Sequence, residues 1–121
     1  MTAVFDSNIL IDFLNGASEP RQEFRRHRRR AVSVITWIEV LAGARNPDED
    51  QRIRDLLSRF TVVSIGDGVR DRAVAIRRAG RLKLPDAIIL ATAQELGWLL
   101  VTRNTKDFPP SDPTIRVPYT L

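Results

Sequence analysis

Residues 3–14 read Ala-Val-Phe-Asp-Ser-Asn-Ile-Leu-Ile-Asp-Phe-Leu, and the spacing of apolar residues changes in the middle of this stretch. The first three residues are apolar and predict a short buried strand. Asp6 is a residue type that often caps a helix, and Ile9, Leu10 and Phe13 then recur at helical spacing. A strand that leads directly into a helix is the repeating unit of α/β folds, so the stretch indicates that fold class.

The same succession of strand and helix continues along the chain. Short apolar or β-branched runs predict further strands over residues 32–35, 62–65, 98–101 and 115–117. Helical spacing and cap residues predict helices over residues 19–30, 36–43, 47–60, 69–80 and 86–96. Strands joined by helical crossovers run parallel. We therefore expect one domain over residues 1–121, an α/β domain of three α/β/α layers with a mostly parallel central sheet.

Composition narrows the class of protein. The chain has 121 residues and no cysteine, which excludes disulfides and thiolate metal sites and fits a reducing cytoplasm. The first residues do not resemble a signal peptide and the apolar runs are too short to span a bilayer, so we expect a cytoplasmic protein without membrane contact. All but two of the 19 basic residues are arginine, the better partner for phosphate. Codon usage in a GC-rich genome explains the same bias, and both interpretations stay open.

Four acidic residues each have an ordinary structural explanation when they are considered singly. Asp6 can cap a helix, and Glu39 can complete a capping box with Thr36. Asp86 suits the positive end of a helix dipole. Asp107 can occupy a solvated turn. For any one of them, the structural explanation is the simpler one.

Considered together, the four acids predict a metal site. Asp6, Glu39 and the polar stretch that contains Asp107 each follow a predicted strand, and the working residues of parallel sheets lie beyond the carboxyl ends of the strands. Two carboxylates about 4 Å apart repel by roughly 4 kcal/mol at an effective dielectric of 20. A shared pocket therefore requires protons or cations. A ligand set made only of oxygen atoms selects Mg²⁺ or Mn²⁺.

Four segments carry motifs in a fixed order along the chain: Asp-Ser-Asn-Ile-Leu-Ile-Asp (6–12), Ile-Thr-Trp-Ile-Glu-Val-Leu-Ala-Gly (35–43), Lys-Leu-Pro-Asp-Ala-Ile-Ile-Leu-Ala-Thr-Ala (83–93) and Val-Thr-Arg-Asn-Thr-Lys-Asp-Phe (101–108). They resemble the motifs of PIN-domain proteins, and most closely those of VapC toxins of bacterial toxin–antitoxin pairs. The resemblance extends over nearly the whole chain. It implies a PIN-like fold, a homodimer, and a cognate antitoxin as partner in a heteromeric complex.

The resemblance also assigns roles to single residues. It implies a catalytic site of Asp6, Glu39, Asp86 and Asp107, in which Asp6, Asp86 and Asp107 bind Mg²⁺ or Mn²⁺ and Glu39 either binds metal or orients the attacking water. Ser7 and Thr102 fall where the family has small hydroxyl residues near the metal. Asn104 stands where many members carry an acid, which predicts weaker binding of a second metal.

The chain has a single histidine, His27, which excludes nucleases that use a pair of histidines within one chain. For the same reason we expect no Ser-His-Asp catalytic set. We therefore expect a metal-dependent endoribonuclease that hydrolyses RNA phosphodiesters with metal-activated water. A hydrolase that phosphorylates an aspartate is disfavoured, because position 8 is asparagine where such enzymes typically carry a second acid. The remaining alternative is a PIN-fold module that binds RNA or protein with weak or no catalysis.

Arginine is concentrated between residues 21 and 30, in the predicted helix 19–30. Arg25, Arg26, Arg28 and Arg29 are the candidates for contact with RNA phosphates. The alternatives are a solvated helix face and a contact with an acidic segment of the antitoxin.

Overall fold

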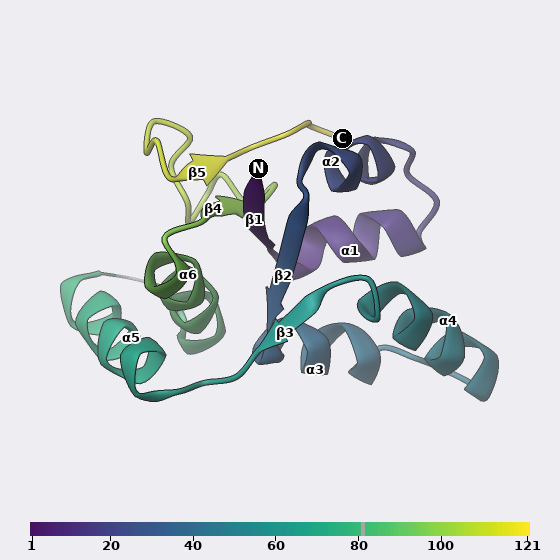
Figure 1. The fold of residues 1–121 in the computed structure, drawn as a ribbon, viewed down its shortest axis with the longest axis horizontal. Coiled ribbons are helices and arrows are strands. Elements are labelled where there is room, and N and C mark those ends of the chain that lie inside the picture. The colour runs from purple at the N-terminus through teal and green to yellow at the C-terminus, as the bar shows by residue number, and fades with distance from the viewer. Residues whose placement is uncertain (81) are drawn as a thin grey trace.

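The computed structural model describes residues 1–80 and 82–121, and these residues form strands and helices around one sheet (Figure 1). In chain order the elements are β1 (Thr2–Phe5), α1 (Ser7–Leu14), α2 (Glu19–Arg26), β2 (Arg29–Ser33), α3 (Val34–Ala42), α4 (Pro47–Leu57), β3 (Thr61–Val63), α5 (Asp67–Ala79), α6 (Leu84–Leu96), β4 (Leu99–Val101) and β5 (Ile115–Arg116). Within this described part of the chain, each helix is too short or too polar to cross a membrane.

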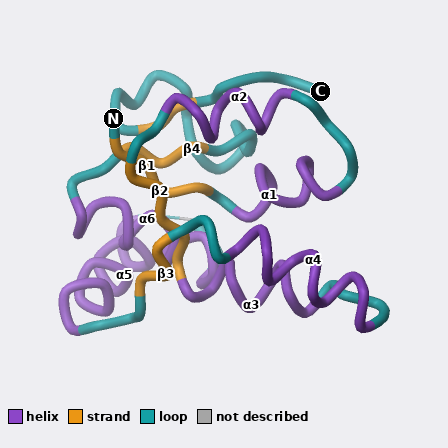
Figure 2. Tube along the Cα trace, turned by 45° about the vertical axis from the view of Figure 1, so that its right-hand side comes forward, coloured by secondary structure: helices purple, strands orange, loops and turns teal. Residues whose placement is uncertain are grey.

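The sheet is parallel throughout, with strand order β3-β2-β1-β4-β5. The chain first moves outward from β1 to β2 and β3, and then returns to place β4 and β5 on the other side of β1. Because crossovers between parallel strands are right-handed, this reversal puts α1–α4 on one face and α5 and α6 on the other (Figures 1 and 2). The predicted three-layer α/β/α architecture with a parallel sheet is confirmed.

Alternate residues of each strand face the two helical layers. In β1, Ala3 and Phe5 belong to the core beneath α1–α4, whereas Val4 packs with Leu100 of β4 in the core beneath α6. The aromatic rings of Phe5 and Phe24 meet edge to face, with centroids 5.3 Å apart. The reversal of strand order also brings the carboxyl ends of β1 and β4 side by side. Ligand sites of open parallel sheets lie at such a switch point.

The predicted helix over residues 19–30 is wrong at its C-terminal end. Helix α2 stops at Arg26, His27 has extended backbone angles, and Arg29 and Arg30 already belong to β2. The reason is tertiary: Arg29 donates its backbone N–H to the Met1 carbonyl (3.2 Å), and β2 pairs with β1 from this residue onward. Arg28 and Arg29 therefore do not share a helix face with Arg25 and Arg26.

The start of α3 also differs from the predicted capping box. Ser33 is the cap, and its hydroxyl accepts the N–H of Ile35 (3.1 Å). The strand therefore ends earlier than predicted and Thr36 lies inside the helix, fully buried. Two other predicted boundaries are confirmed: the helix predicted from residue 47 begins there, after the cap Asn46, and the helix predicted to end at residue 96 ends there, before left-handed Gly97 (φ 69°).

Candidate active site

Asp6 is held at the centre of the candidate site by the junction of β1 and α1. It caps α1, and its Oδ1 accepts the N–H of Ser7 (2.7 Å). Its Oδ2 accepts hydrogen bonds from the Thr102 hydroxyl (2.8 Å) and the Asn8 amide (3.3 Å). Only 4% of Asp6 is exposed. The helix cap and the predicted site residue are thus the same side chain.

A second acid reaches this junction from α3. The Ser7 hydroxyl donates to Glu39 Oε1 (2.8 Å) and lies 3.1 Å from Thr36 Oγ1. Glu39 is otherwise exposed. Its carboxylate therefore binds a hydroxyl on α1 instead of closing a capping box on its own helix.

The remaining two acids come from α6 and from the loop after β4. Asp86 lies in the first turn of α6 and is half-buried, whereas Asp107 is exposed. Asn104 donates its side-chain amide to Asp107 Oδ2 (3.0 Å) and accepts the Asp107 N–H (3.3 Å). The Thr102 hydroxyl accepts the Asn104 N–H (3.0 Å). One chain of hydrogen bonds therefore connects Asp6 to Asp107.

The charges of the four acids act on one another. Burial raises the pKa of Asp6 to about 6; hydrogen bonds from Thr102 and Ser7 oppose this shift, and the negative charges of Asp86 and Glu39 add to it. Burial also raises the pKa of Asp86, with further contributions from Asp107 and Glu39 and an opposing one from Lys83. Among the described residues, none of the four carboxylates forms an ion pair with a basic side chain.

The acidic side chains are spaced too widely in this structure to form a closed metal-binding cluster. Within residues 1–80 and 82–121, no three acids approach closely enough to hold one ion as they stand. The donor chemistry nevertheless fits a hard divalent cation, since the polar groups around Asp6 are carboxylates, hydroxyls and amides. The negative charges of Asp86 and Glu39 act on the buried Asp6 carboxylate, and a divalent cation would neutralise this charge.

Two supporting groups were missed in the sequence. Asn8 accepts the Arg103 N–H (3.1 Å) and thereby ties α1 to the loop after β4. Asp12, buried at the other end of α1, accepts two hydrogen bonds from the Arg103 guanidinium (2.7 and 2.9 Å) and one from the Tyr119 hydroxyl (2.9 Å). The signal was present: Asp12 is a charge within the apolar run Ile-Asp-Phe.

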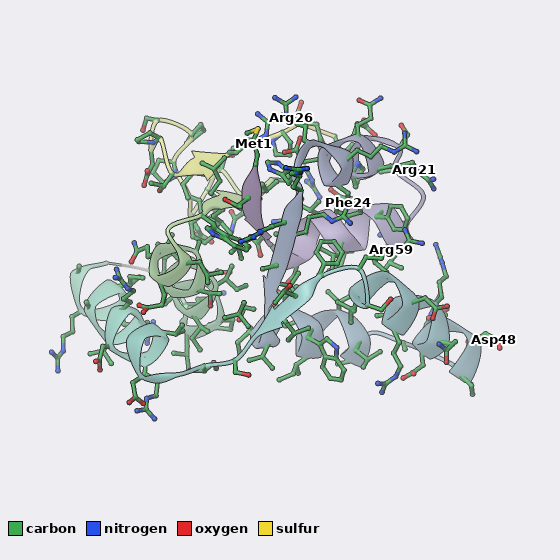
Figure 3. All side chains as sticks on the ribbon, in the orientation of Figure 1. Met1, Arg21, Phe24, Arg26, Asp48 and Arg59 are labelled. Atoms are coloured by element: carbon green, nitrogen blue, oxygen red, sulfur yellow. The ribbon has the colours of Figure 1, made fainter. Side chains whose placement is uncertain are left out.

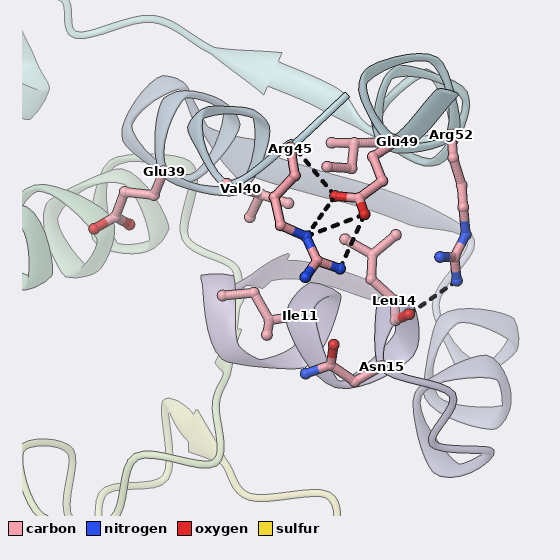
Figure 4. Close-up of a pocket in the computed structure, with 10 residues that line it drawn as sticks. Ile11, Leu14, Asn15, Glu39, Val40, Arg45, Glu49 and Arg52 are labelled. Atoms are coloured by element: carbon pink, nitrogen blue, oxygen red, sulfur yellow. Dashed lines mark hydrogen bonds and ion pairs between the residues drawn. The ribbon is translucent and has the colours of Figure 1, made fainter. Parts of the chain in front are cut away.

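A groove of about 400 Å³ adjoins the site between α1, α3 and α4, with Glu39 among its lining residues (Figure 4). Its apolar lining includes Ile11, Leu14 and Val40. Its polar side is the Arg45–Glu49 ion pair (3.0 Å) and Arg52, which donates to the Leu14 carbonyl (2.9 Å). The groove thus offers an apolar floor with charges of both signs beside the acids.

The predicted RNA-binding arginines do not lie at the acids. Arg25 and Arg26 are on α2, Arg28 follows that helix, and Arg29 begins β2. The start of β2 is at the amino ends of the strands, whereas Asp6 follows the carboxyl end of β1. The two groups of residues occupy opposite ends of the sheet.

Comparison with known proteins gives a family and a set of similar folds. The PIN domain family matches residues 3–109. A chain from a toxin–antitoxin complex of Klebsiella pneumoniae is 46% identical, with a TM-score of 0.91 over 98% of this chain and 99% of that one. A chain of DNA-bound VapBC from Salmonella typhimurium (23% identity, TM-score 0.76, 96% of both chains) and one of FitAcB from Neisseria gonorrhoeae (19%, 0.78, 98% and 99%) share the fold. No curated protein sequence matches significantly.

Proposed function

The chain belongs to the PIN domain family, and on this premise we propose that it is a metal-dependent endoribonuclease, the toxin of a VapBC-type toxin–antitoxin pair. The toxin role is supported by the 46% identity to a chain of a toxin–antitoxin complex. The nuclease activity rests on one observation: the buried Asp6 carboxylate experiences the charges of Glu39 and Asp86, and no basic side chain among residues 1–80 and 82–121 pairs with it. The proposal treats residues 1–121 as one domain that acts on RNA in the cytoplasm.

In this proposal the acids have different roles. Asp6, Asp86 and Asp107 would hold Mg²⁺ or Mn²⁺. Hydrogen bonds from Ser7 and Thr102 orient Asp6, and those with Asn104 orient Asp107. A divalent cation supplies charge neutralisation at the phosphoryl oxygens and activation of water. Glu39 keeps one carboxylate oxygen on the Ser7 hydroxyl (2.8 Å), which fixes its direction. Its other oxygen is then free to orient the attacking water or to bind the cation.

The partners follow from the surfaces beside the site. The groove between α1, α3 and α4 has an apolar floor and reaches Glu39, so it suits an amphipathic segment of the antitoxin that would block access to the acids. Exposed apolar side chains such as Ile38 (52% exposed) and Leu84 (56%) lie near the same end of the fold and favour a homodimer. The toxin would thus form a heteromeric complex built on its own dimer.

A PIN-fold binding module with weak catalysis is the second candidate. The observation in its favour is the loose spacing of the acids, together with Asn104 at the place where many relatives carry an acid. Such a module would bind RNA or a protein without a requirement for metal. The two candidates therefore differ in one measurable property, which is cleavage that depends on Mg²⁺ or Mn²⁺.

Product analysis tests the proposal directly. Purified protein incubated with a long single-stranded RNA should cut it in Mg²⁺ or Mn²⁺ and leave it intact in chelator. Water attack should produce 5′-phosphate and 3′-hydroxyl ends. Ends carrying a 2′,3′-cyclic phosphate, or equal cleavage in chelator, would exclude the metal mechanism. An intact RNA under all metal conditions, with RNA binding retained, would favour the binding module.

A further inference from the structure

A second concave surface lies at the amino ends of the strands, where β2 and β3 begin. It encloses about 490 Å³ and is lined by Arg28, Arg29, Arg30 and Arg59, with Ser58, Phe60, Thr61 and Trp98. We call these residues the arginine cleft. A smaller neighbouring hollow adds Arg21 and Arg25 to Arg30 and Arg59. Figure 3 shows Arg21 and Arg59 on either side of the space between α2 and the end of α4.

Most of the other arginines that the structure describes are paired with an acid. The arginines that form an ion pair with a carboxylate are Arg26, Arg45, Arg54, Arg70, Arg72, Arg103 and Arg116. Within the described chain no such pair includes an arginine of the cleft, nor Arg21, Arg25, Arg52, Arg77 or Arg78. Arg30 instead donates to the Phe24 carbonyl (3.0 Å) and lies 5.9 Å from the centre of the Phe60 ring.

Acids do lie in the neighbourhood, but they do not neutralise the cleft. Asp55 shares another hollow with Arg59 and accepts a hydrogen bond from Gln51 (2.9 Å). Glu23 on α2 is buried and bound to Arg116 and His27. Several guanidinium groups around one concavity repel one another, so the cleft favours an anion.

The lining indicates the kind of anion. Arginine forks and the hydroxyl of Thr61 are groups that commonly contact nucleic-acid phosphates, whereas the Ser58 hydroxyl donates to the Asp55 carbonyl (2.6 Å). Trp98 is half-buried, and its ring supplies an aromatic surface for a base in the same cleft. A carboxylate-rich peptide would use the guanidinium groups but would leave the indole without a stacking partner. The combination favours a single-stranded nucleic acid.

The cleft is separate from the acids. Arg29 pairs in register with Thr2, the first residue of β1, and Asp6 follows the last. At about 3.3 Å per residue, β1 alone separates the two places by roughly 13 Å. We propose that the arginine cleft is a second RNA site, which binds the sugar-phosphate backbone away from the bond that is cut. This inference rests on the proposed function, because it takes RNA as the substrate.

Trp98 provides a local probe, since the only other tryptophan is Trp37. In a Trp37→Phe, Asp6→Asn protein, which leaves RNA uncut, a 12-nucleotide single-stranded RNA should quench Trp98 fluorescence. Adding R28Q, R29Q and R59Q should weaken binding by about tenfold or more in 0.1 M salt, and should reduce the slope of log affinity against log salt by about two. The matched control carries R70Q, R77Q and R78Q on α5, which remove the same charge, and should keep both the quenching and the slope.

Three results would overturn the inference: an unchanged salt slope in the cleft variant, equal losses in the two triple variants, or tighter binding of a glutamate-rich peptide than of RNA through the same arginines. The last would assign the cleft to an acidic protein partner. Melting curves of all variants verify folding. The experiment measures RNA binding in a variant that does not cleave RNA. A wild type that cleaves no RNA would therefore reject the proposed function, whereas the binding data would still decide whether the cleft binds RNA.

Discussion

Two regions of the molecule bury carboxylates to a similar extent, but the groups that surround these carboxylates differ in charge. At the carboxyl ends of β1 and β4, Asp6 (4% exposed) has hydroxyl, amide and acidic neighbours, and no guanidinium of the described residues pairs with it. Where the C-terminal segment lies against α1 and α2, Asp12 (6%) and Glu23 (4%) each bind an arginine through two hydrogen bonds. We call this second region the seam; it consists of Asp12–Arg103–Tyr119 and Glu23–Arg116–His27.

The pKa values follow the same division. Burial and the nearby acids raise the pKa of Asp6 to about 6. Burial would also raise the pKa of Glu23, but hydrogen bonds from Arg116 and His27 and their charges outweigh it, so that this pKa lies below its usual value. Burial of a carboxylate therefore does not identify a functional site. What distinguishes the candidate site is burial without a matching cation in the described chain.

The largest effect should come from exchanging one carboxylate in each region. Asp6→Asn should lower RNA cleavage by about a thousandfold or more, because a bound metal contributes several kcal/mol to catalysis. Asp12→Asn keeps an oxygen for Arg103 and should lower cleavage by less than about tenfold. Single-turnover rates on the same RNA measure both. Equal losses in the two variants would remove the distinction between the regions.

The next effect is on folding and belongs to the seam. Arg103→Ala leaves the buried Asp12 carboxylate with only Tyr119 as donor, and should lower the free energy of unfolding by about 3 kcal/mol. Arg72→Ala is the matched control, since it breaks the half-exposed pair with Glu95, and should cost less than about 1 kcal/mol. Urea denaturation compares them. A seam variant no less stable than the control would mean that this pair is merely a surface contact.

The stabilisation by metal should depend on the acids of the candidate site and not on those of the seam. At a hundred times its Kd, Mg²⁺ or Mn²⁺ should raise the free energy of unfolding of the wild type by about 2.7 kcal/mol. Asp86→Asn should reduce this gain, and in chelator it should melt at or above the wild type because it relieves repulsion. Asp12→Asn should retain the full gain. Thermal melts with and without chelator decide, and an Asp86→Asn protein that melts clearly lower in chelator would make Asp86 a structural cap.

The smallest effect is the pH dependence of the seam. The pKa of Glu23 is lowered in the folded protein from 4.5, so its contribution to stability is complete well above 4.5 and is lost as the pH falls from there through the lower pKa of the folded state. Glu23 faces Arg26 on its own helix, His27 at the end of that helix and Arg116 from β5. Glu23→Gln should therefore flatten the stability curve between about pH 6 and pH 3.

Salt separates this effect from that of a surface acid. Glu49 also has a lowered pKa through Arg45, but the Arg45 side chain is 84% exposed, so the effect of Glu49→Gln should fade in high salt. The effect of Glu23→Gln should persist. Denaturation at each pH, in low and high salt, provides the measurement. Parallel curves for Glu23→Gln and the wild type would show that this carboxylate is not coupled to folding.

The parallel sheet could be predicted from the sequence, because short apolar runs separated by helices imply helical crossovers. The strand order, and with it the pairing of β1 with β4, could not be predicted, because the alternation of strands and helices is compatible with several orders. The hydrogen bond between Thr102 and Asp6 is consistent with the predicted approach of their segments. The metal ligands and the RNA substrate stay predictions. The sequence alone could not show that Arg28 and Arg29 leave the helix, because pairing of β2 with β1 decides this. Nor could it pair Asp12 with Arg103, since ion pairs distant in sequence depend on the finished fold.

The position of β1 at the centre of the sheet has a consequence for biosynthesis. Its neighbour β4, the Thr102 hydroxyl that binds Asp6, and the arginines of the seam all belong to the last quarter of the chain. Segments near the N-terminus emerge first during translation, so Asp6, Asp12 and Glu23 wait for partners that are made last. The acidic site can be assembled only after Thr102 has left the ribosome. For the ribonuclease proposed above, this order would delay activity until most of the domain has been made.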